Sequence, residues 1–107
     1  PIKYKQTTLQ QWNTAAEAWH RWAPLLSRWL GPATETMLDM CEISRGSRVL
    51  DVAAGAGEQT LAVAKRVGET GHVLATDISS EMVERTARRG HRQQARRRNA
   101  WAGAGRP

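Results

Sequence analysis

The stretch Arg48-Val49-Leu50-Asp51-Val52-Ala53-Ala54-Gly55-Ala56-Gly57 decides the fold of this 107-residue chain. Its apolar run predicts a short strand of a parallel sheet that is covered on both faces. The glycines predict a sharp turn, and a helical segment at 58–67 follows immediately. Because the N–H groups that begin a helix meet the carboxyl end of a strand here, this is the place where an open α/β sheet binds a ligand.

The segment that follows predicts a complete βαβ unit. Residues 72–77 (His-Val-Leu-Ala-Thr-Asp) have the composition of a second buried strand, after a short turn at 68–71. Two strands joined through one helix by such short links are expected to run parallel. Either Ser79 or Ser80 can cap a further helix. We therefore expect an α/β fold in which N-terminal helices precede one βαβ unit and a further helix.

The segment before the first strand is rich in tryptophan and has the spacing of helices. Residues 8–22 predict one helix, Pro24 breaks that helix or starts a second one that Gly31-Pro32 ends, and residues 33–43 predict a third. Cys41 is interpreted as a small core residue of the third helix. The apolar face of the first helix is interpreted as packing against the main domain, and also as a lid over the ligand site; it consists of Leu9, Trp12, Ala15, Ala16, Trp19, Trp22 and Ala23.

The net charge of +6 is concentrated at the C-terminal end. Residues 1–84 hold eight basic and ten acidic side chains, whereas residues 85–107 hold eight arginines and no acid. The segment 89–107 is predicted to be a disordered, arginine-rich tail, and one hypothesis is that it is translated from a shifted reading frame that begins near Arg89. The alternative function is a non-specific nucleic-acid-binding module that uses this tail. Since no recognised nucleic-acid motif accompanies the arginines, nucleic acid is not the expected partner.

The remaining composition narrows the class of protein. One cysteine and three scattered histidines indicate neither a disulfide framework nor a metal site, and they favour a reducing, cytoplasmic location. We expect no signal peptide and no membrane partner, because no apolar segment is long enough. Residues 1–88 are expected to form the structured part. No residue is assigned a catalytic role from the sequence.

Two acids at the ends of the predicted strands indicate what the turn binds. Asp51 precedes the turn and can organise the loop or attract a cation, while Asp77 follows Gly57 by twenty residues and can accept hydrogen bonds from both hydroxyls of a ribose. Taken alone, Asp77 could equally cap the next helix or belong to the turn before it, but in combination with the glycine turn the interpretation as a ribose ligand is favoured. A dinucleotide fingerprint needs a third glycine where this chain has Thr60, and an acidic strand end repels a pyrophosphate. A cofactor with a nucleoside half and a cationic half, S-adenosylmethionine, is therefore favoured over a nicotinamide dinucleotide.

The residues 49–57 resemble the first motif of class I S-adenosylmethionine-dependent methyltransferases. Residues 72–82 resemble the second strand of that family and the beginning of its next helix. The tryptophan-rich leader is similar to those of the ubiquinone/menaquinone-methylase-like group, which acts on small molecules. The resemblance covers about residues 8–88, the N-terminal part of such a domain, and implies a truncated Rossmann-like fold.

The resemblance also implies a cofactor site and a class of substrate. The family usually has glycine at the position of Ala53. The methyl acceptor is expected to be a small molecule, and the chain to be a fragment with part of the cofactor site, since only two of the family's seven strands have a counterpart. Asp51, Ala53, Gly55 and Gly57 would surround the methionine half of S-adenosylmethionine, Asp77 would hold the ribose, and Ile78 and Met82 would lie against or near the adenine.

Two strands without further neighbours have a physical consequence. The first strand would keep an unpaired edge and uncovered apolar surface. We therefore expect either marginal stability or self-association of the chain through the exposed edge of its sheet.

Overall fold

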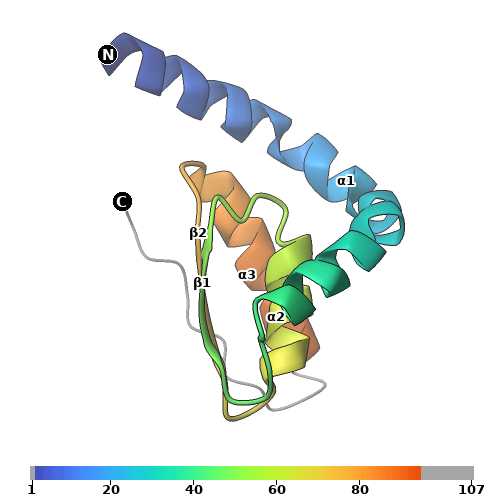
Figure 1. Ribbon diagram of the computed structural model, residues 1–107. Helices are drawn as coiled ribbons and strands as arrows, with labels where there is room; N and C mark the ends of the chain where they lie inside the picture. Colours follow the sequence, from blue (N-terminus) through green and yellow to red (C-terminus); the bar gives the residue numbers. More distant parts are fainter. Residues whose placement is uncertain (1, 95–107) are drawn as a thin grey trace.

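A computed structural model describes residues 2–94, with the backbone alone for residue 2 and for residues 91–94. The elements are α1 (Ile2–Met40), β1 (Arg48–Val52), α2 (Glu58–Val67), β2 (His72–Thr76) and α3 (Ser80–Gln94). This order confirms the α/β fold with a βαβ unit and a further helix (Figure 1). Residues 89–94 of the predicted arginine-rich tail belong to α3, so the expectation of disorder is wrong for them; the rest of the tail lies outside the described residues from residue 95 onward, and its disorder stays a prediction.

The two strands pair in parallel, as expected from the βαβ connection. Arg48 lies opposite His72 and Val52 lies opposite Thr76. The backbone N–H of Ala54 donates to the carbonyl of Thr76 at 2.9 Å, which ties the turn after β1 to the end of β2. Both carboxyl ends therefore meet at one edge of the sheet, where the candidate site lies.

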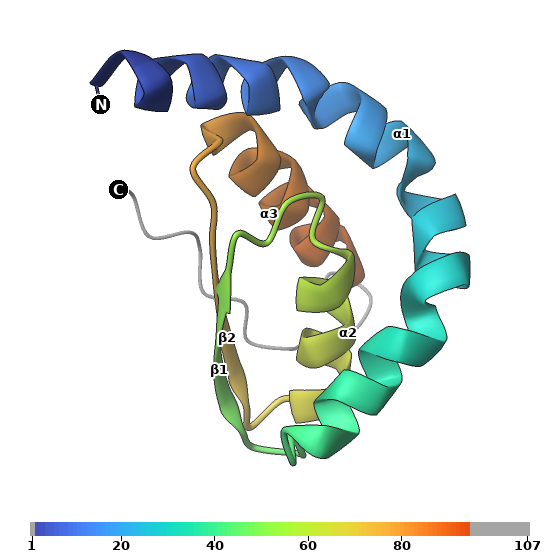
Figure 2. The same ribbon diagram turned by 45° about the horizontal axis from the view of Figure 1, so that its top comes forward.

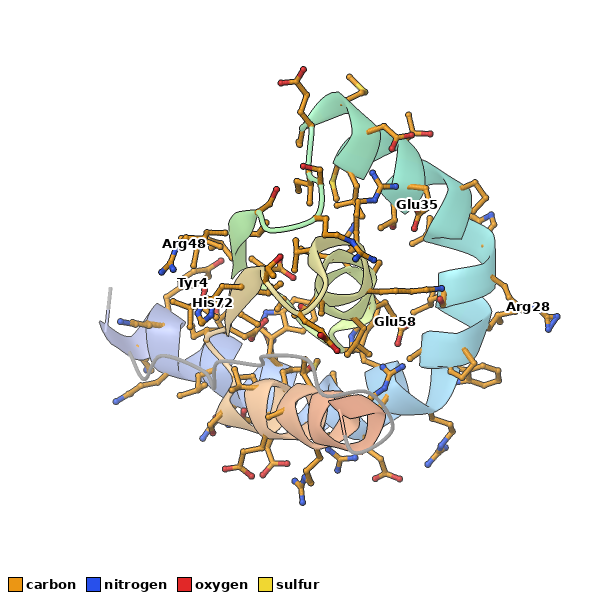
Figure 3. All side chains as sticks on the ribbon, turned by 90° about the horizontal axis from the view of Figure 1, so that it is seen from below. Tyr4, Arg28, Glu35, Arg48, Glu58 and His72 are labelled. Atoms are coloured by element: carbon orange, nitrogen blue, oxygen red, sulfur yellow. The ribbon has the colours of Figure 1, made fainter. Side chains whose placement is uncertain are left out.

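Helices α2 and α3 lie on one side of the sheet, and α1 crosses over the carboxyl ends of the strands before it descends on that same side (Figures 1 and 2). The buried core on that side consists of Leu38, Val63, Val67 and Val73. On the opposite face Leu50 is 61 % exposed and Val52 is 70 % exposed. Figure 3 shows Arg48 and His72 on this uncovered side. The expectation that β1 is covered on both faces is therefore wrong, whereas the expectation of uncovered apolar surface is confirmed.

The N-terminal segment is a single helix, α1, and not the series of helices that the prolines predicted. Pro24 and Pro32 both lie inside it. A proline removes one intrahelical hydrogen bond and displaces the preceding turn, which bends a helix without ending it when both halves are held by packing. Figure 2 shows the result, an arc that passes over the carboxyl ends of the strands and then down the outer side of α2.

Contacts along its length hold this arc in place. Small residues of the predicted tryptophan face, Ala16 and Ala23, are buried to 1 % exposure. Further along the helix, Glu35 and Asp39 both bind the guanidinium of Arg66 on α2. The helix is therefore fixed near its middle by close packing and near its end by ion pairs.

The end of α1 corrects the interpretation of Cys41. The helix ends at Met40, and Glu42 has a φ of 54°, which turns the chain toward β1. The thiol of Cys41 is exposed and is not part of the core. Leu38 supplies the buried side chain of this last turn, with no exposed surface.

Candidate cofactor-binding site

The turn between β1 and α2 has a strongly left-handed backbone. Ala53, Gly55 and Gly57 have φ values of 60°, 56° and 82°. A Cβ atom on Gly57 would lie 2.7 Å from Oγ1 of Thr86, so only glycine fits there without displacement of α3. Ala53 has the same left-handed conformation with a side chain, which is unfavourable for an L-residue.

Asp77 joins the two chain segments at the carboxyl end of the sheet. One carboxylate oxygen accepts a hydrogen bond from the N–H of Gly55 at 2.9 Å, and the other accepts one from the N–H of Ser79 at 2.8 Å. The residue therefore organises the turn before α3, as one of the two sequence interpretations proposed. A carboxylate has about four acceptor positions, so the two oxygens can still accept hydrogen bonds from ligand hydroxyls.

Asp51 is directed at α2 and not at the open side of the turn. It accepts a hydrogen bond of 2.5 Å from the hydroxyl of Thr60, which is fully buried. Thr60 stands where a dinucleotide fingerprint has its third glycine, and its hydroxyl links β1 to the first turn of α2. The sequence singled out both residues but did not indicate this hydrogen bond.

The helix α3 braces the glycine turn through residues that the sequence did not indicate. The buried hydroxyl of Thr86 donates to the carbonyl of Gly55 at 3.1 Å. One turn later, Arg89 donates to the carbonyl of Ala56 at 3.1 Å and also binds Glu58. Figure 3 shows Glu58 in the space that α1, α2 and α3 enclose. The available signal in the sequence was the three-residue spacing of Thr86 and Arg89, which places both side chains on the same face of α3.

A serine completes the connection between β2 and α3. The buried hydroxyl of Ser79 accepts a hydrogen bond from the N–H of Met82 at 3.2 Å and donates to Asn13 of α1 at 2.5 Å. Of the two serines that could cap α3, Ser79 is therefore the one that does so. The same side chain attaches the first half of α1 to the site.

A cavity of about 980 Å³ lies between this site and α1. Six of the seven residues expected at the cofactor line it, whereas Asp51 does not. On the side of the sheet its wall consists of 52–59, Ala62, Thr76, Asp77, Ile78 and Met82; on the side of α1 it consists of Lys5, Trp12, Trp19, Leu26, Ser27, Leu30, Gly31, Thr34 and Glu35. The tryptophan helix thus covers the candidate site, which agrees with its interpretation as a lid.

One histidine lies between α1 and α3, outside the cavity. Burial of the His20 imidazole lowers its pKa, and the positive charges of Arg89, Arg85 and Arg88 lower it further, while Glu58 acts in the opposite direction. The Nε2 atom of His20 is buried without a hydrogen-bond partner. These conditions favour the neutral imidazole.

Neither a metal centre nor a membrane span is found in the part of the chain that the structure describes. No group of three or more histidine, cysteine or acidic side chains among residues 2–94 could hold a metal ion. Within the same residues, no helix combines the length and the apolar character that crossing a bilayer requires.

Known proteins similar to this chain are methyltransferases. A family profile described as a methyltransferase domain matches residues 49–104, just over half of the chain. A ubiquinone/menaquinone biosynthesis C-methyltransferase UbiE of Azotobacter vinelandii is 43 % identical over 47 residues, which are 44 % of this chain and 19 % of that protein. The protein of the same name from Hydrogenovibrio crunogenus is 48 % identical over 46 residues, 43 % of this chain and 18 % of that one.

Solved structures show the same similarity at the level of the fold. A SAM dependent methyltransferase from Aquifex aeolicus superposes with a TM-score of 0.58 at 28 % identity, covering 69 % of this chain and 38 % of the other. A protein-L-isoaspartate O-methyltransferase superposes with a TM-score of 0.57 at 21 % identity, covering 67 % of this chain and 22 % of the other. In the two UbiE proteins, the segment that matches this chain makes up about a fifth of the length of the protein.

Proposed function

Because the chain belongs to the methyltransferase domain family, we propose that it is the N-terminal, cofactor-binding part of an S-adenosylmethionine-dependent methyltransferase that acts on a small molecule. The family match and the Rossmann-like fold of the Aquifex neighbour support this proposal. The observation that carries it is the position of Asp77, whose carboxylate binds the glycine turn and also lines the cavity.

The residues around the cavity fit the two halves of this cofactor. Asp77 would hold the ribose hydroxyls with its remaining acceptor positions. Ile78 and Met82 offer apolar surface to an adenine ring, and the backbone at Gly55 and Gly57 allows close approach of the methionine half. Asp51 would act from behind the turn, through Thr60. When bound, S-adenosylmethionine supplies a methyl group on a positively charged sulfur.

Two other functions are less well supported. A nicotinamide dinucleotide would bring a negatively charged pyrophosphate to a turn flanked by Asp51 and Asp77. These carboxylates would repel it. The nucleic-acid alternative depends on an arginine tail that lies outside the described residues from residue 95 onward. The similarities to methyltransferases favour neither of them.

Titration calorimetry tests the proposed cofactor. The 107-residue chain is titrated with S-adenosylmethionine, with NAD and with a random DNA duplex, and only the first is expected to bind. Asp77→Asn should lower the affinity for S-adenosylmethionine about tenfold or more, because a hydrogen bond to a charged group is worth about 1.5–3 kcal/mol. Glu69→Gln, an exposed turn residue outside the cavity, is the matched control. A folded protein that gives no heat with S-adenosylmethionine would contradict the proposal.

We further propose that the 107-residue chain by itself binds S-adenosylmethionine but does not transfer its methyl group. Support comes from the Aquifex chain, of which this chain covers 38 %. A cytoplasmic location is part of the same proposal, supported by the single cysteine. Methyl transfer by the isolated chain to any small acceptor would disprove this division of roles.

Self-association through the sheet is the last part of the proposal. The exposed side chains of Leu50 and Val52 form apolar surface beside the outer edge of β1, and such edges pair readily with another strand. Sedimentation velocity is expected to show a dimer that Leu50→Arg dissociates. Leu25→Arg, at a similarly exposed position on α1, should leave the dimer intact. If the protein is a monomer at all concentrations, the proposed self-association is wrong.

A further inference from the structure

The wall of the cavity that α1 forms has a regular composition. Lys5, Trp12, Trp19 and Leu26 are spaced by seven residues along the helix, and all four line the cavity. Residues at this interval lie on one side of a helix. The wall therefore presents one cation, two aromatic rings and one aliphatic side chain in that order along α1.

The charged side chains that line the cavity include one cation, Lys5, and it has no counter-ion among the described residues. Glu35 is paired with Arg66, and Figure 3 shows it directed from α1 toward α2. Glu58 is paired with Arg89. Asp77 accepts N–H groups with both oxygens. Lys5 takes part in none of the ion pairs that the structure describes among residues 2–94. An anionic ligand group would therefore be attracted to this end of the wall.

The two tryptophans of the wall form an aromatic surface that is still accessible. Their ring centroids lie 6.3 Å apart with an angle of 44° between the ring planes. Trp12 is 41 % exposed and Trp19 is 42 % exposed, although both line a cavity. A flat ring placed against them would bury apolar area and add favourable aromatic contacts, which a chain-like aliphatic ligand does not provide.

The cavity is large for a single small ligand. Its volume of about 980 Å³ lies at the upper end of the range of roughly 300–1,000 Å³ that is typical of sites for one drug-sized ligand. Since the residues assigned to the cofactor lie on the wall of the sheet, the wall of α1 is left for a second molecule.

We propose that Lys5, Trp12 and Trp19 form the subsite for the methyl acceptor, and that this acceptor is a planar, conjugated molecule with an anionic group. The inference rests on the proposed function, because the chain has a methyl acceptor only if it belongs to a methyltransferase. It adds the chemical class of that acceptor and the residues of α1 that select it.

The side chains that line the cavity are consistent with an acceptor of this class. In the part of the chain that the structure describes, no histidine, cysteine or tyrosine lines the cavity, and its three carboxylates are already engaged: Glu35 with Arg66, Glu58 with Arg89, and Asp77 with two backbone N–H groups. An acceptor whose nucleophilic atom is already anionic needs no base: its electron pair forms the bond to the methyl carbon, and the electron pair of the broken carbon–sulfur bond returns to sulfur. No proton moves in this step.

Three probes separate flatness, charge and apolar character. Quinaldate is a flat anion, quinaldamide is its neutral match, and cyclohexanecarboxylate is an anion without a flat ring. Each is titrated calorimetrically into the 107-residue chain, both alone and saturated with S-adenosylmethionine. Quinaldate is expected to bind roughly fivefold more tightly than quinaldamide and about tenfold more tightly than cyclohexanecarboxylate.

Matched variants assign these preferences to residues. Lys5→Gln should abolish the preference for quinaldate over quinaldamide, whereas Lys3→Gln, outside the cavity, should retain it. Trp12→Leu should weaken both flat probes by about tenfold, whereas Trp29→Leu, outside the cavity and 75 % exposed, should not. Where Trp12→Leu fails to fold, Trp12→Phe against Trp12→Met makes the same comparison.

The outcomes separate this inference from the proposed function. Equal affinity for quinaldate and quinaldamide, or unchanged binding by both Lys5→Gln and Trp12→Leu, would overturn the assignment of the subsite even if S-adenosylmethionine binds. Binding of quinaldate with the expected variant effects supports the subsite, and if S-adenosylmethionine gives no heat in that same protein, the proposed cofactor is what fails.

Discussion

The backbone at Ala53 provides a sharp test of the reasoning about the glycine turn. Ala53 has a φ of 60°, in the left-handed region, and its side chain is exposed. Replacement by glycine removes the clash between Cβ and the backbone without leaving a cavity in the core. Ala53→Gly is therefore expected to stabilise the protein, which is unusual for the loss of a side chain.

The expected magnitude follows from two opposing effects at this residue. A left-handed conformation costs an L-residue about 1–2 kcal/mol, whereas glycine loses about 0.5–1 kcal/mol more conformational free energy on folding than alanine. The net gain in the free energy of unfolding of Ala53→Gly is thus between about 0 and 1.5 kcal/mol, with a central value of about 0.75 kcal/mol. For a domain of this size, the central value corresponds to an increase of the melting temperature by roughly 3–6 °C. Thermal and urea denaturation followed by circular dichroism measure both values.

The next residue in the chain is the matched control. Ala54 is absent from the residues with positive φ, so Ala54→Gly has no strain to relieve and should destabilise by about 0.4–1 kcal/mol. The two substitutions remove the same methyl group from adjacent positions and are expected to change stability in opposite directions. If Ala53→Gly is as destabilising as Ala54→Gly, the assignment of strain to this turn is refuted.

Three further substitutions test other parts of the structure. Gly57→Ala should destabilise by about 2–5 kcal/mol in chemical denaturation, because its φ is 82° and the new Cβ would lie 2.7 Å from a threonine hydroxyl of α3. Ser79→Ala should lower the free energy of unfolding by about 0.5–2 kcal/mol through loss of the cap of α3, and an equal loss in Ser80→Ala would contradict the assignment of the cap. Burial, and then the arginines of α3, lower the pKa of His20 in the folded state, so unfolding takes up a proton at acidic pH. The contribution of His20 to the free energy of unfolding should therefore be fully present above pH 6.5 and decrease as the pH falls below this value. His20→Gln should make melting temperatures less dependent on pH in that acidic range, and an unchanged profile would exclude His20 as the cause.

Several features of the site were predictable from the sequence because they depend on neighbouring residues. The alternation of apolar strand, glycine turn and helix at 48–67 predicted the βαβ unit, and the parallel pairing of β1 with β2 confirms it. The unusual conformation of the turn was also predictable, since Gly55 and Gly57 accept positive φ values. Their spacing from Asp77 placed that acid at the same edge of the sheet.

Errors arose where distant contacts outweigh local preference. Pro24 and Pro32 locally favour an end of the helix, yet α1 continues through both because its two halves pack on different parts of the molecule. Cys41 had the right periodicity for the core, but the chain leaves α1 one residue earlier and exposes it. Spacing alone does not specify which side of a helix meets the rest of the protein.

The sequence by itself determined the family resemblance, the βαβ unit and the acids at the strand ends, because each depends on residue type and short spacing. Only the tertiary structure decided that Thr60 binds Asp51, that Arg89 braces the turn, and that α1 forms one wall of the cavity. These contacts join residues far apart in the chain or on different elements. Their formation depends on the three-dimensional course of the backbone, which no local pattern of residues contains.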